Sequence, residues 1–401
     1  MTETPLDLLV VGAGPVGIAC GIEAARAGLS CRLVEKGALC NTLLGWPVET
    51  VFFSTAELLE IGGFPFVTSG PKPTRREGIR YYRKAAAMAR LDVRLYERVL
   101  GASREGELFA VATERGTHRC RKLVVATGFF DTPNLLGVVG EELPKVTHYY
   151  REAYPYCGTD VLVVGGGNSA VEAALDLYRN GAMVTMAVRE TSLKPTIKYW
   201  LLPDLTNRIQ EGAIQARFET EVERIEERSV LLRTGSERWS LPNDFVVALT
   251  GYHPDFPLLG ALGVAMTPDG KVPHDEATME TPAPGLYVAG VVAAGVEIGK
   301  LFIENGRRHA AQIVTHAAAS LGRPLPVTGA FPGIRTFQDG DLWREHRLPG
   351  SSRTCCRPVG RSQRAWRSGR LTGRRRARPG SARSPSRGGS SSSPSTRSSC
   401  P

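Results

Sequence analysis

Two stretches of the chain repeat the same succession of apolar run, glycine-rich turn and amphipathic segment. DLLVV at residues 7–11 leads into GAGPVG, then IACGIEAARAGL and then SCRLVEK. DVLVV at residues 160–164 leads into GGGNSAVEAALDLYRNGA and then MVTMAVRE. Short apolar runs that end at glycine are typical of strands in a buried parallel sheet, and the helical periodicity that follows predicts a helix. The pattern predicts an α/β protein with two strand–turn–helix–strand units.

The glycine spacing of the first unit predicts a dinucleotide site. In such a turn the first glycine permits the tight bend, the second lets the backbone approach a pyrophosphate, and the third lets helix and strand pack closely. The helix N-terminus offers free N–H groups to the anion. Glu35 lies eighteen residues after the third glycine and is placed to accept hydrogen bonds from ribose hydroxyls. The residues predicted to bind the cofactor here are Gly12, Gly14, Pro15, Val16, Gly17, Glu35 and Lys36.

The second unit differs at the positions that would select a different nucleotide. Ala170 replaces the third glycine, and the second strand ends at Arg189 with no acid at the ribose position. A carboxylate there would repel a 2′-phosphate, whereas a guanidinium pairs with it bidentately, so the sequence predicts NADP(H). Glu190 opposes this assignment, and the alternative is that the cations are solvated surface charges. The predicted ligands are Gly165, Gly167, Asn168, Ser169, Ala170, Arg189 and Lys194, with Lys198 close by.

Three further apolar runs indicate how the two units are connected. KLVVATGFFDTP at residues 122–133 and FVVALTGYHPDF at residues 245–256 each contain a Thr-Gly turn where the chain can pass between domains. APGLYVAGVVAAG at residues 283–295 supplies another strand, and a helix is predicted to begin near Lys300. The predicted organisation is one dinucleotide-binding domain built from residues 1–129 and 250–330, a second one inserted at residues 130–249, and a separate segment at residues 331–401.

The net positive charge lies after residue 330. The whole chain carries +10, and residues 331–401 hold sixteen Arg, no Lys and three acids, so residues 1–330 carry −3. The last segment is rich in Arg, Ser, Gly and Pro, cannot bury enough apolar surface to fold, and is predicted to be a disordered tail. Its lack of Lys also fits out-of-frame translation of GC-rich DNA, and a nucleic-acid-binding arm is the third hypothesis. The mildly acidic body does not itself favour a nucleic-acid partner.

Cysteine usage excludes one common redox device. Eight cysteines are present and none forms a C-x-x-C pair, which excludes the usual dithiol motif and zinc knuckles. Cys20, Cys31 and Cys120 lie in or beside predicted elements and are expected to be small buried hydrophobes. The first residues lack the features of a secretory signal, and no apolar run has the length of a membrane span. We therefore expect a cytoplasmic protein with no metal site and no membrane partner.

The nesting of one dinucleotide unit inside another resembles the two-domain flavoprotein reductases of the thioredoxin reductase type. A narrower resemblance lies between the motifs. The stretches at residues 41–66 (NTLLGWPVETVFFSTAELLEIGGFPF), 148–156 (HYYREAYPY), 195–212 (PTIKYWLLPDLTNRIQEG) and 298–310 (IGKLFIENGRRHA) are similar to the YpdA family of proposed bacillithiol disulfide reductases. This resemblance covers about residues 6–320. It implies two nested Rossmann-like domains with FAD in the first and NADPH in the second, and the reduction of bacillithiol disulfide, a small-molecule substrate. A homo-oligomer is a separate expectation, which the sequence does not define further.

The resemblance also assigns residues in the first domain. It implies that Thr127, Gly128 and Gly290 contribute to the FAD site, and that helix N–H groups near Lys300 stabilise negative charge on the reduced flavin. Family members often carry a cysteine within the first glycine turn, proposed as a thiol relay, where this chain has Val16. Either electrons pass to the substrate without that relay or another thiol serves.

No catalytic acid or base follows from the sequence. Cys40 is a weak candidate for the relay, because its loop approaches the flavin in such folds. His148, Tyr150 and His253 are weak candidates for the place where the two domains face each other, since each lies in or near a crossing segment. The alternative is that the tyrosine is a packing anchor and the histidines are hydrogen-bonded residues of the domain boundary.

Other functions stay open at this point. A ferredoxin or flavodoxin NADP reductase of the same architecture also lacks a dithiol. A flavin monooxygenase also has two glycine motifs, but it expects F-x-G-x-x-x-H, and counting back from His148 those positions hold Glu142 and Pro144. A non-enzymatic, nucleotide-bound redox sensor is the third alternative, because Val16 removes the expected thiol.

Overall fold

The computed structural model describes residues 4–297, 299 and 301–323. Lys300, one of the predicted cofactor ligands, and the predicted tail at residues 331–401 lie outside the described residues. None of the helices in the described ranges combines the length and the apolar character that crossing a membrane requires.

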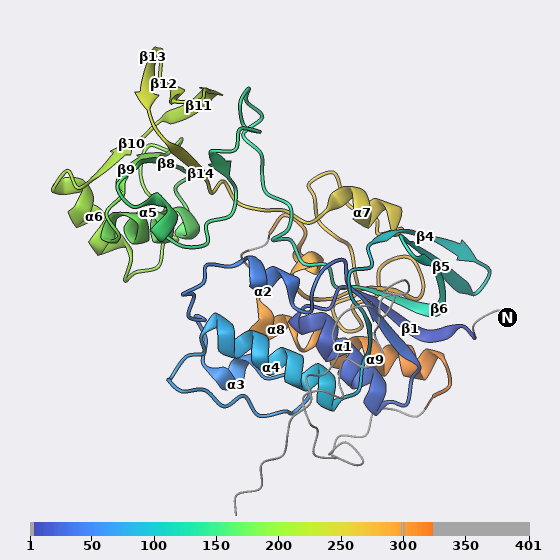
Figure 1. The fold of residues 1–401 in the computed structure, drawn as a ribbon. Helices are drawn as coiled ribbons and strands as arrows, with labels where there is room; N and C mark the ends of the chain where they lie inside the picture. The colour runs from blue at the N-terminus through green and yellow to red at the C-terminus, as the bar shows by residue number, and fades with distance from the viewer. Residues whose placement is uncertain (1–3, 298, 300, 324–401) are drawn as a thin grey trace, which may run out of the picture. The chain divides into compact units, whose positions relative to one another are not determined.

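A seven-stranded sheet carries the first glycine-rich turn (Figure 1). Its order is β3-β2-β1-β6-β5-β4, with β15 paired to β6. β4, β5 and β6 are antiparallel neighbours, and the other pairs are parallel. The strands are β1 (Leu6–Val11), β2 (Cys31–Val34), β3 (Asp92–Arg94), β4 (Val99–Glu105), β5 (Leu108–Thr113), β6 (Gly116–Val125) and β15 (Leu286–Val288).

Strand β6 joins the parallel and antiparallel parts of this sheet. Its second half pairs with β1 and β15, and its first half pairs with β5. Because β1, β2, β6 and β15 run in the same direction, the chain leaves all four at one edge of the sheet. The residues brought to that edge include Gly12, Glu35, Ala126 and Gly290.

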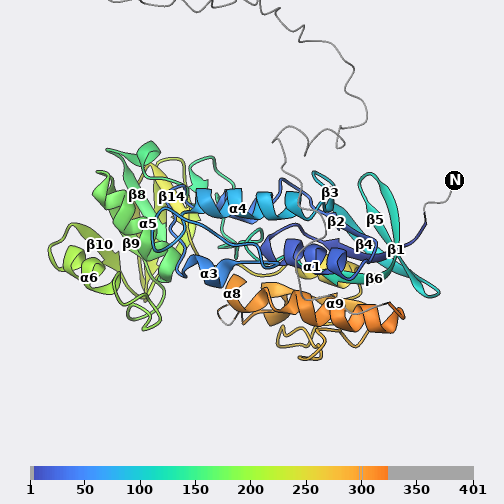
Figure 2. The same cartoon turned by 90° about the horizontal axis from the view of Figure 1, so that it is seen from below.

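Helices α1 to α4, α7, η2, α8 and α9 belong with the seven-stranded sheet. α1 packs against both α4 and α9, as the view from below shows (Figure 2). α1 begins at Pro15, whose fixed φ and missing N–H suit the first position of a helix. The helices are α1 (Pro15–Arg26), α2 (Asn41–Gly45), α3 (Ala56–Leu59), α4 (Arg75–Met88), α7 (Phe256–Ala261), the 3-10 helix η2 (Gly290–Ala294), α8 (Ile303–Gly306) and α9 (His309–Ser320).

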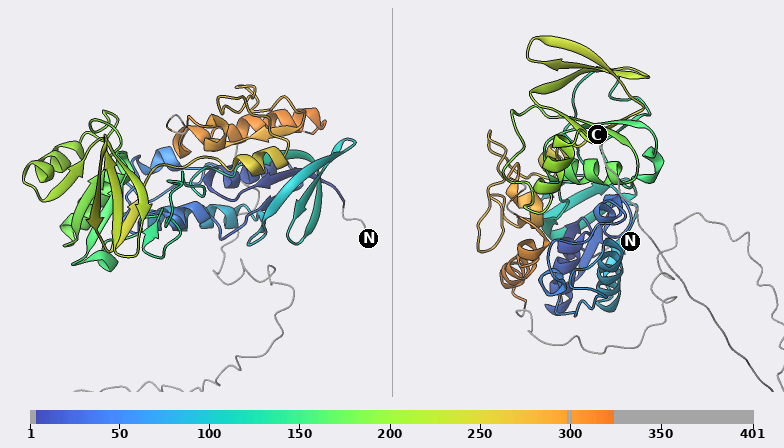
Figure 3. Two further views of the ribbon diagram at one scale, coloured as in Figure 1. Left: turned by 90° about the horizontal axis from the view of Figure 1, so that it is seen from above. Right: turned by 90° about the vertical axis from the view of Figure 1, so that its left-hand side faces the viewer.

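A parallel five-stranded sheet carries the second glycine-rich turn. Its order is β10-β9-β8-β14-β7. α5 and α6 contribute to the apolar core on one face, and the antiparallel sheet β11-β12-β13 contributes to the core on the other (Figure 3). The elements are β7 (Val146–Thr147), the 3-10 helix η1 (Tyr154–Tyr156), β8 (Asp160–Val164), α5 (Asn168–Arg179), β9 (Met183–Ala187), α6 (Leu202–Gln210), β10 (Ile214–Arg217), β11 (Thr220–Ile225), β12 (Ser229–Thr234), β13 (Glu237–Pro242) and β14 (Phe245–Ala248).

The predicted α/β class with two strand–turn–helix–strand units is confirmed, but one predicted helix is wrong in detail. The helix expected to run on from about Lys300 is divided into α8 and α9, with a turn at Arg307 and Arg308. The Arg307 guanidinium donates hydrogen bonds to the carbonyl groups of Glu57 and Glu60 in and after α3. These tertiary contacts hold the chain in place at the turn. They cannot be predicted from the helical periodicity of the sequence.

Candidate functional site

The first glycine-rich turn has one open position and two crowded ones. Gly12 has φ of +105°, and a Cβ atom there would lie 2.6 Å from the carbonyl oxygen of Ala126. A Cβ atom on Gly17 would lie 2.1 Å from the carbonyl oxygen of Gly12. At Gly14 a Cβ atom would meet no other part of the chain within 4 Å. The space beside Gly14, at the N-terminus of the twelve-residue helix α1, therefore suits a phosphate group.

Glu35 lies just beyond β2 and turns its carboxylate toward the same turn. Its Oε2 accepts a hydrogen bond from the Ala13 N–H at 2.9 Å, and its Oε1 accepts one from the Gly37 N–H at 3.0 Å. Burial raises the pKa of this carboxyl, although the two N–H donors oppose the shift. Each oxygen has a lone pair left, so the carboxylate can still accept from a ribose hydroxyl.

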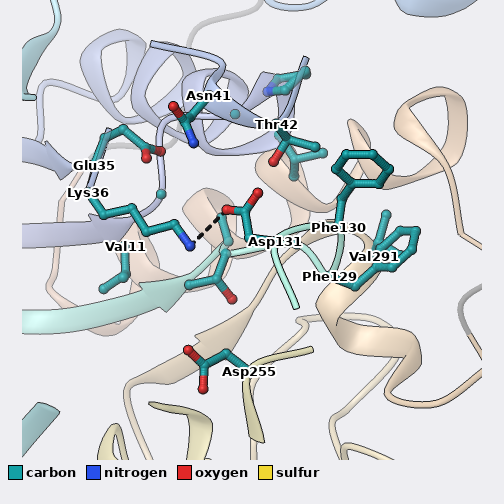
Figure 4. A pocket seen from close by; sticks show the side chains of 18 of the residues that line it. Val11, Glu35, Lys36, Asn41, Thr42, Phe129, Phe130, Asp131, Asp255 and Val291 are labelled. Atoms are coloured by element: carbon teal, nitrogen blue, oxygen red, sulfur yellow. Dashed lines mark ion pairs between the residues drawn. The ribbon is translucent and has the colours of Figure 1, made fainter. Parts of the chain in front are cut away.

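One pocket gathers most of the residues predicted for the first site (Figure 4). Gly17 lies behind it, in the contact between α1 and β1. Other parts of the wall come from α2, the segment after β6, the start of β4, α7, η2 and α8. The predicted residues that line the pocket are Gly12, Gly14, Pro15, Val16, Glu35, Lys36, Thr127, Gly128 and Gly290.

A charged pair lies within this pocket. The Lys36 Nζ is 2.8 Å from the Asp131 Oδ2, and Figure 4 shows the two side chains pointing toward each other. Asp131 follows the Ala-Thr-Gly turn after β6, and Asn41 and Thr42 from α2 line the same cavity. Amide, hydroxyl and charged groups thus share the pocket with the apolar rings of Phe129 and Phe130, a mixture that suits a dinucleotide with an aromatic ring.

A buried histidine that does not line the pocket supports the pocket wall at Gly290. Gly290 has φ of +74°, and Val16 and Gly306 both approach it closely. The Gly290 N–H donates to the His309 Nδ1 at 3.2 Å. Burial, with a smaller contribution from His274, lowers the pKa of His309 to about 4, so the imidazole is neutral at pH 7 and its Nδ1 is free to accept.

The second glycine-rich turn repeats the geometry of the first. Gly165 has φ of +132°, and a Cβ atom there would lie 2.4 Å from the carbonyl oxygen of Leu249. Gly167, like Gly14, has open space around its Cβ position, and the buried Ala170 takes the place of the third glycine. The N-terminus of the twelve-residue helix α5 follows at Asn168.

Cationic residues surround the loop that follows β9. Arg189 is 75% exposed, and its Nε is 3.5 Å from Glu190, which also pairs with Lys194 at 3.0 Å. Desolvation raises the pKa of Glu190, but the hydrogen bond from Lys194 and the charges of Lys194 and Arg189 outweigh it and lower the pKa below its ordinary value. The Asn168 Oδ1 accepts from the Lys198 N–H at 2.8 Å, which ties this loop to the glycine-rich turn. Lys198 itself pairs with Glu172.

The weak catalytic candidates do not line the first pocket. Cys40 is 1% exposed, and burial raises its pKa. The His148 Nε2 is 3.3 Å from Glu141, the His253 Nδ1 is 2.7 Å from the carbonyl oxygen of Pro254, and the Tyr150 hydroxyl donates to Asp176. These contacts fit the alternative in which the histidines and the tyrosine are packing and boundary residues.

The other cysteines that the structure describes are also outside the first pocket. The expected burial of Cys20 and Cys120 is confirmed, and desolvation raises the pKa of each thiol to about 12. Cys31 is half-buried and Cys157 is exposed. Within the described ranges no group of three or more His, Cys, Asp or Glu side chains is arranged to hold a metal ion.

Several residues that line the pocket were not predicted from the sequence. Asp131 lies inside a segment that was predicted only as a crossing. Trp46 lies in a stretch used only for the family resemblance, and Arg98 lies in a stretch without a motif. His309 stands in a predicted helix that gives no sign of its contact with Gly290. The charge of Asp131, three residues after a Thr-Gly turn, was the one usable signal, because polar residues that follow a parallel strand tend to reach its ligand.

The chain is similar to known flavoprotein reductases. Residues 9–290 match the family model described as pyridine nucleotide-disulphide oxidoreductase. Bacilliredoxin reductase Bdr of Bacillus subtilis (strain 168) is 39% identical over 313 residues, which cover 77% of this chain and 97% of that protein.

Two solved structures extend this similarity to the fold. The bacillithiol disulfide reductase Bdr (YpdA) from Bacillus cereus has a TM-score of 0.77 and 38% identity, and the match covers 79% of this chain and 100% of that one. The corresponding reductase from Staphylococcus aureus has a TM-score of 0.75 and 35% identity, with 80% and 99% covered. The resemblance stated from the sequence is confirmed, and the chain is an oxidoreductase that belongs to the pyridine nucleotide-disulphide oxidoreductase family, among the Bdr (YpdA) reductases.

Proposed function

We propose that this protein transfers reducing equivalents from NADPH, through FAD, to bacillithiol disulfide. The observation that carries the proposal is the pair of glycine-rich turns, each with open space at its middle glycine, of which only the first is followed by a buried carboxylate and only the second by a cluster of cations. The similarity to the Bdr reductases supports the choice of a disulfide as the acceptor.

In this proposal the first pocket holds FAD, which supplies the two-electron chemistry when bound. The N–H groups at the start of α1 and the open space at Gly14 would take the pyrophosphate. Glu35 would accept the ribose hydroxyls with the lone pairs left by Ala13 and Gly37. His309 would keep the Gly290 wall in place from behind, because its Nδ1 accepts the Gly290 N–H.

The second turn would hold NADPH. The N–H groups at the start of α5 would take the pyrophosphate, and Arg189 and Lys194 would pair with the 2′-phosphate. Their present partner Glu190 is a single carboxylate shared between them, so a doubly charged phosphate can compete for both cations. The Asn168 contact with the Lys198 backbone would keep the cationic loop beside the turn.

Reduction of the acceptor would not involve a protein thiol. One S–S bond breaks and two S–H bonds form, with two electrons and one proton delivered as the hydride of NADPH and the second proton taken from solvent. None of the described cysteines lines the first pocket, and Val16 occupies the position of the relay thiol. The substrate disulfide would therefore react at the cofactor itself, and the role of the chain would be to position it.

The test is an anaerobic titration of the purified, flavin-loaded protein. NADPH should bleach the flavin absorbance faster than NADH, and bacillithiol disulfide should restore it. Prior alkylation of accessible thiols with iodoacetamide should leave both steps unchanged. Restoration by an oxidised iron–sulfur protein and not by any disulfide would instead identify a ferredoxin reductase. Bleaching by NADH alone would contradict the proposed role of Arg189.

A further inference from the structure

Helix α4 and the segment that leads into it concentrate positive charge on an otherwise acidic body. Residues 71–90 contain seven cationic side chains and one acid, a net charge of +6. The first 330 residues together carry −3. This short segment is therefore a strong local departure from its surroundings.

Three of these cations form one line on the helix. Arg76, Arg80 and Lys84 are exposed and follow each other at four-residue spacing, which places them on one face of α4. None of the three has a hydrogen-bond, ion-pair or ring partner among the described residues. We call these three residues the α4 cationic stripe.

The acid of the helix does not neutralise the stripe. Glu77 is engaged in a capping box, in which its carboxylate accepts from the Thr74 N–H at 2.8 Å and from the Ser69 N–H at 2.9 Å. These hydrogen bonds lower the pKa of Glu77 to about 2, so it is ionised, but its oxygens face the helix start and the preceding loop. The stripe thus keeps its full charge.

The arrangement works against the stability of the helix. Like charges four residues apart repel each other, and cations in the first turn oppose the positive end of the helix dipole. Arg75 and Arg76 occupy that first turn, and the four-residue pairs within the stripe are all cationic. Among the described residues no acid pairs with the stripe, so its charge is available to another molecule.

Exposed apolar side chains lie beside the start of α4. Val51 is 54% exposed and pairs with Thr74 in an isolated bridge. Val67 is 86% exposed and lies two residues before Ser69, which bonds to Glu77. Phe53 is 62% exposed; its ring stacks on that of Trp200 with the centres 5.6 Å apart, and the Lys72 Nζ is 5.1 Å from its ring centre. Exposed apolar side chains close to cations are typical of a protein-binding surface.

The same helix is attached to the wall of the first pocket. The Arg75 guanidinium donates to the carbonyl oxygens of Leu43 at 2.7 Å and Leu44 at 2.8 Å. These carbonyls belong to α2, whose Asn41, Thr42 and Leu43 line the pocket. A partner bound on α4 would therefore sit next to the element that forms one side of the dinucleotide pocket.

We propose that the α4 cationic stripe, together with Val51, Phe53 and Val67, is the docking surface for an acidic protein. The apolar side chains favour a protein over a nucleic acid, because a phosphate backbone offers nothing to bury them against. The charge would steer the encounter, and the valines and the phenylalanine would be buried in the bound state.

The test compares three full-length proteins. The stripe variant R76Q/R80Q/K84Q and the control variant R115Q/R217Q/R228Q each remove three exposed positive charges, and all forms retain the Arg-rich residues 331–401, whose contribution cancels. Proteins captured by the tagged wild type from an extract of the native cells are identified by mass spectrometry. An acidic protein so identified is purified and its Kd is measured by calorimetry at low and at high salt.

We expect the stripe variant to bind the purified acidic protein at least tenfold more weakly, the control variant less than twofold more weakly, and the difference to shrink at high salt. The melting temperature of the stripe variant should equal or exceed that of the wild type, because repulsion within α4 is removed. Equal binding by all three forms, capture of no acidic protein, selective loss of binding to a duplex DNA probe, or a change only in self-association would each overturn the proposal.

Discussion

Gly14 and Gly17 are three residues apart, the first at the N-cap of α1 and the second in the first turn of that helix, and they have opposite surroundings. A Cβ atom at Gly17 would collide with the Gly12 carbonyl oxygen at 2.1 Å, whereas one at Gly14 would enter the open space proposed for a phosphate. We expect Gly17→Ala to lower the free energy of unfolding of the flavin-free protein by roughly 1–3 kcal/mol through overpacking. Gly14→Ala should cost less than about 1 kcal/mol, the modest penalty for replacing an N-cap glycine.

The affinity for FAD distinguishes the two variants. Gly14→Ala should weaken FAD binding at least tenfold while the apoprotein unfolds almost as the wild type does, measured by flavin fluorescence and urea unfolding. Undiminished FAD affinity in Gly14→Ala would show that the pyrophosphate lies elsewhere. Gly17→Ala serves as the reference for a change that acts on the fold itself.

Protonation of His309 should make the free energy of unfolding depend on pH. Its folded pKa of about 4 lies below the ordinary value of 6.5, so the unfolded chain binds the proton more tightly. The stabilisation is therefore complete above pH 6.5 and is lost as the pH falls through 6.5 toward 4. We expect this group to lower the free energy of unfolding by about 2 kcal/mol between pH 7.5 and 5, and by about 3 kcal/mol in full.

The matched variant is His309→Asn, whose side-chain oxygen can still accept the Gly290 N–H but does not titrate. Urea unfolding of both proteins at pH 7.5 and pH 5 isolates the histidine, because all other groups contribute equally to the two. The decrease between these pH values should be about 2 kcal/mol smaller in the variant. An identical decrease in both proteins would mean that His309 does not bind its proton on unfolding.

Arg189 tests the nucleotide preference. If its guanidinium pairs with the 2′-phosphate, Arg189→Gln should raise the KM for NADPH about tenfold, and should change that for NADH less than twofold. The control is Arg179→Gln, which removes an exposed cation of α5 that pairs with Asp204. Steady-state kinetics with both nucleotides provide the measurement, and an equal loss with NADPH and NADH would contradict the assignment.

At the scale of the element, α4 depends on its first turn. The Thr74 Oγ1 accepts from the Glu77 N–H at 3.2 Å, and Glu77 accepts in return from the Thr74 N–H. Thr74→Ala removes the acceptor and should cost about 1 kcal/mol of the free energy of unfolding, whereas Thr74→Ser keeps it and should cost only a few tenths. Urea unfolding compares the two, and equal losses would mean that the methyl group and not the hydroxyl matters.

Elements that rest on local pattern could be predicted from the sequence. β1, α1, β8 and α5 follow from an apolar run, a glycine turn and a helical face, all within about twenty-five residues, and the structure has each of them. The division between α8 and α9 could not be predicted, because it depends on Arg307 and on contacts with α3 far along the chain. The same holds for the Lys36–Asp131 pair, because Lys36 follows β2 and Asp131 follows β6, ninety-five residues further along the chain.

Residues of the site also differ in whether local spacing or tertiary packing positions them. Glu35 was predictable, because its spacing from Gly17 is set by one helix and one strand. His309 was not, because its contact with Gly290 arises from tertiary packing between α9 and the turn after β15. The boundaries near residues 129 and 249 and the cofactor roles of the individual residues stay predictions.

At the scale of the whole molecule, charge is divided between two parts of the chain. Residues 1–330 carry −3, and residues 331–401 supply the remaining positive charge. The matched region covers 97% of the B. subtilis Bdr reductase and 100% of the B. cereus one, yet only 77% and 79% of this chain. Relatives of this family therefore complete their fold within a length that corresponds to the first part.

A chain that ends after residue 330 should consequently keep its flavin and its NADPH-dependent activity, with kcat and KM within twofold of the full-length values. Its net charge of −3 in place of +10 should abolish retention on a cation exchanger at pH 7. The full-length protein, measured in parallel at low and high salt, is the control for non-specific electrostatic effects. Loss of flavin or of activity on truncation would show that residues after 330 take part in the fold or the site, and would overturn the division of the molecule proposed from its charge.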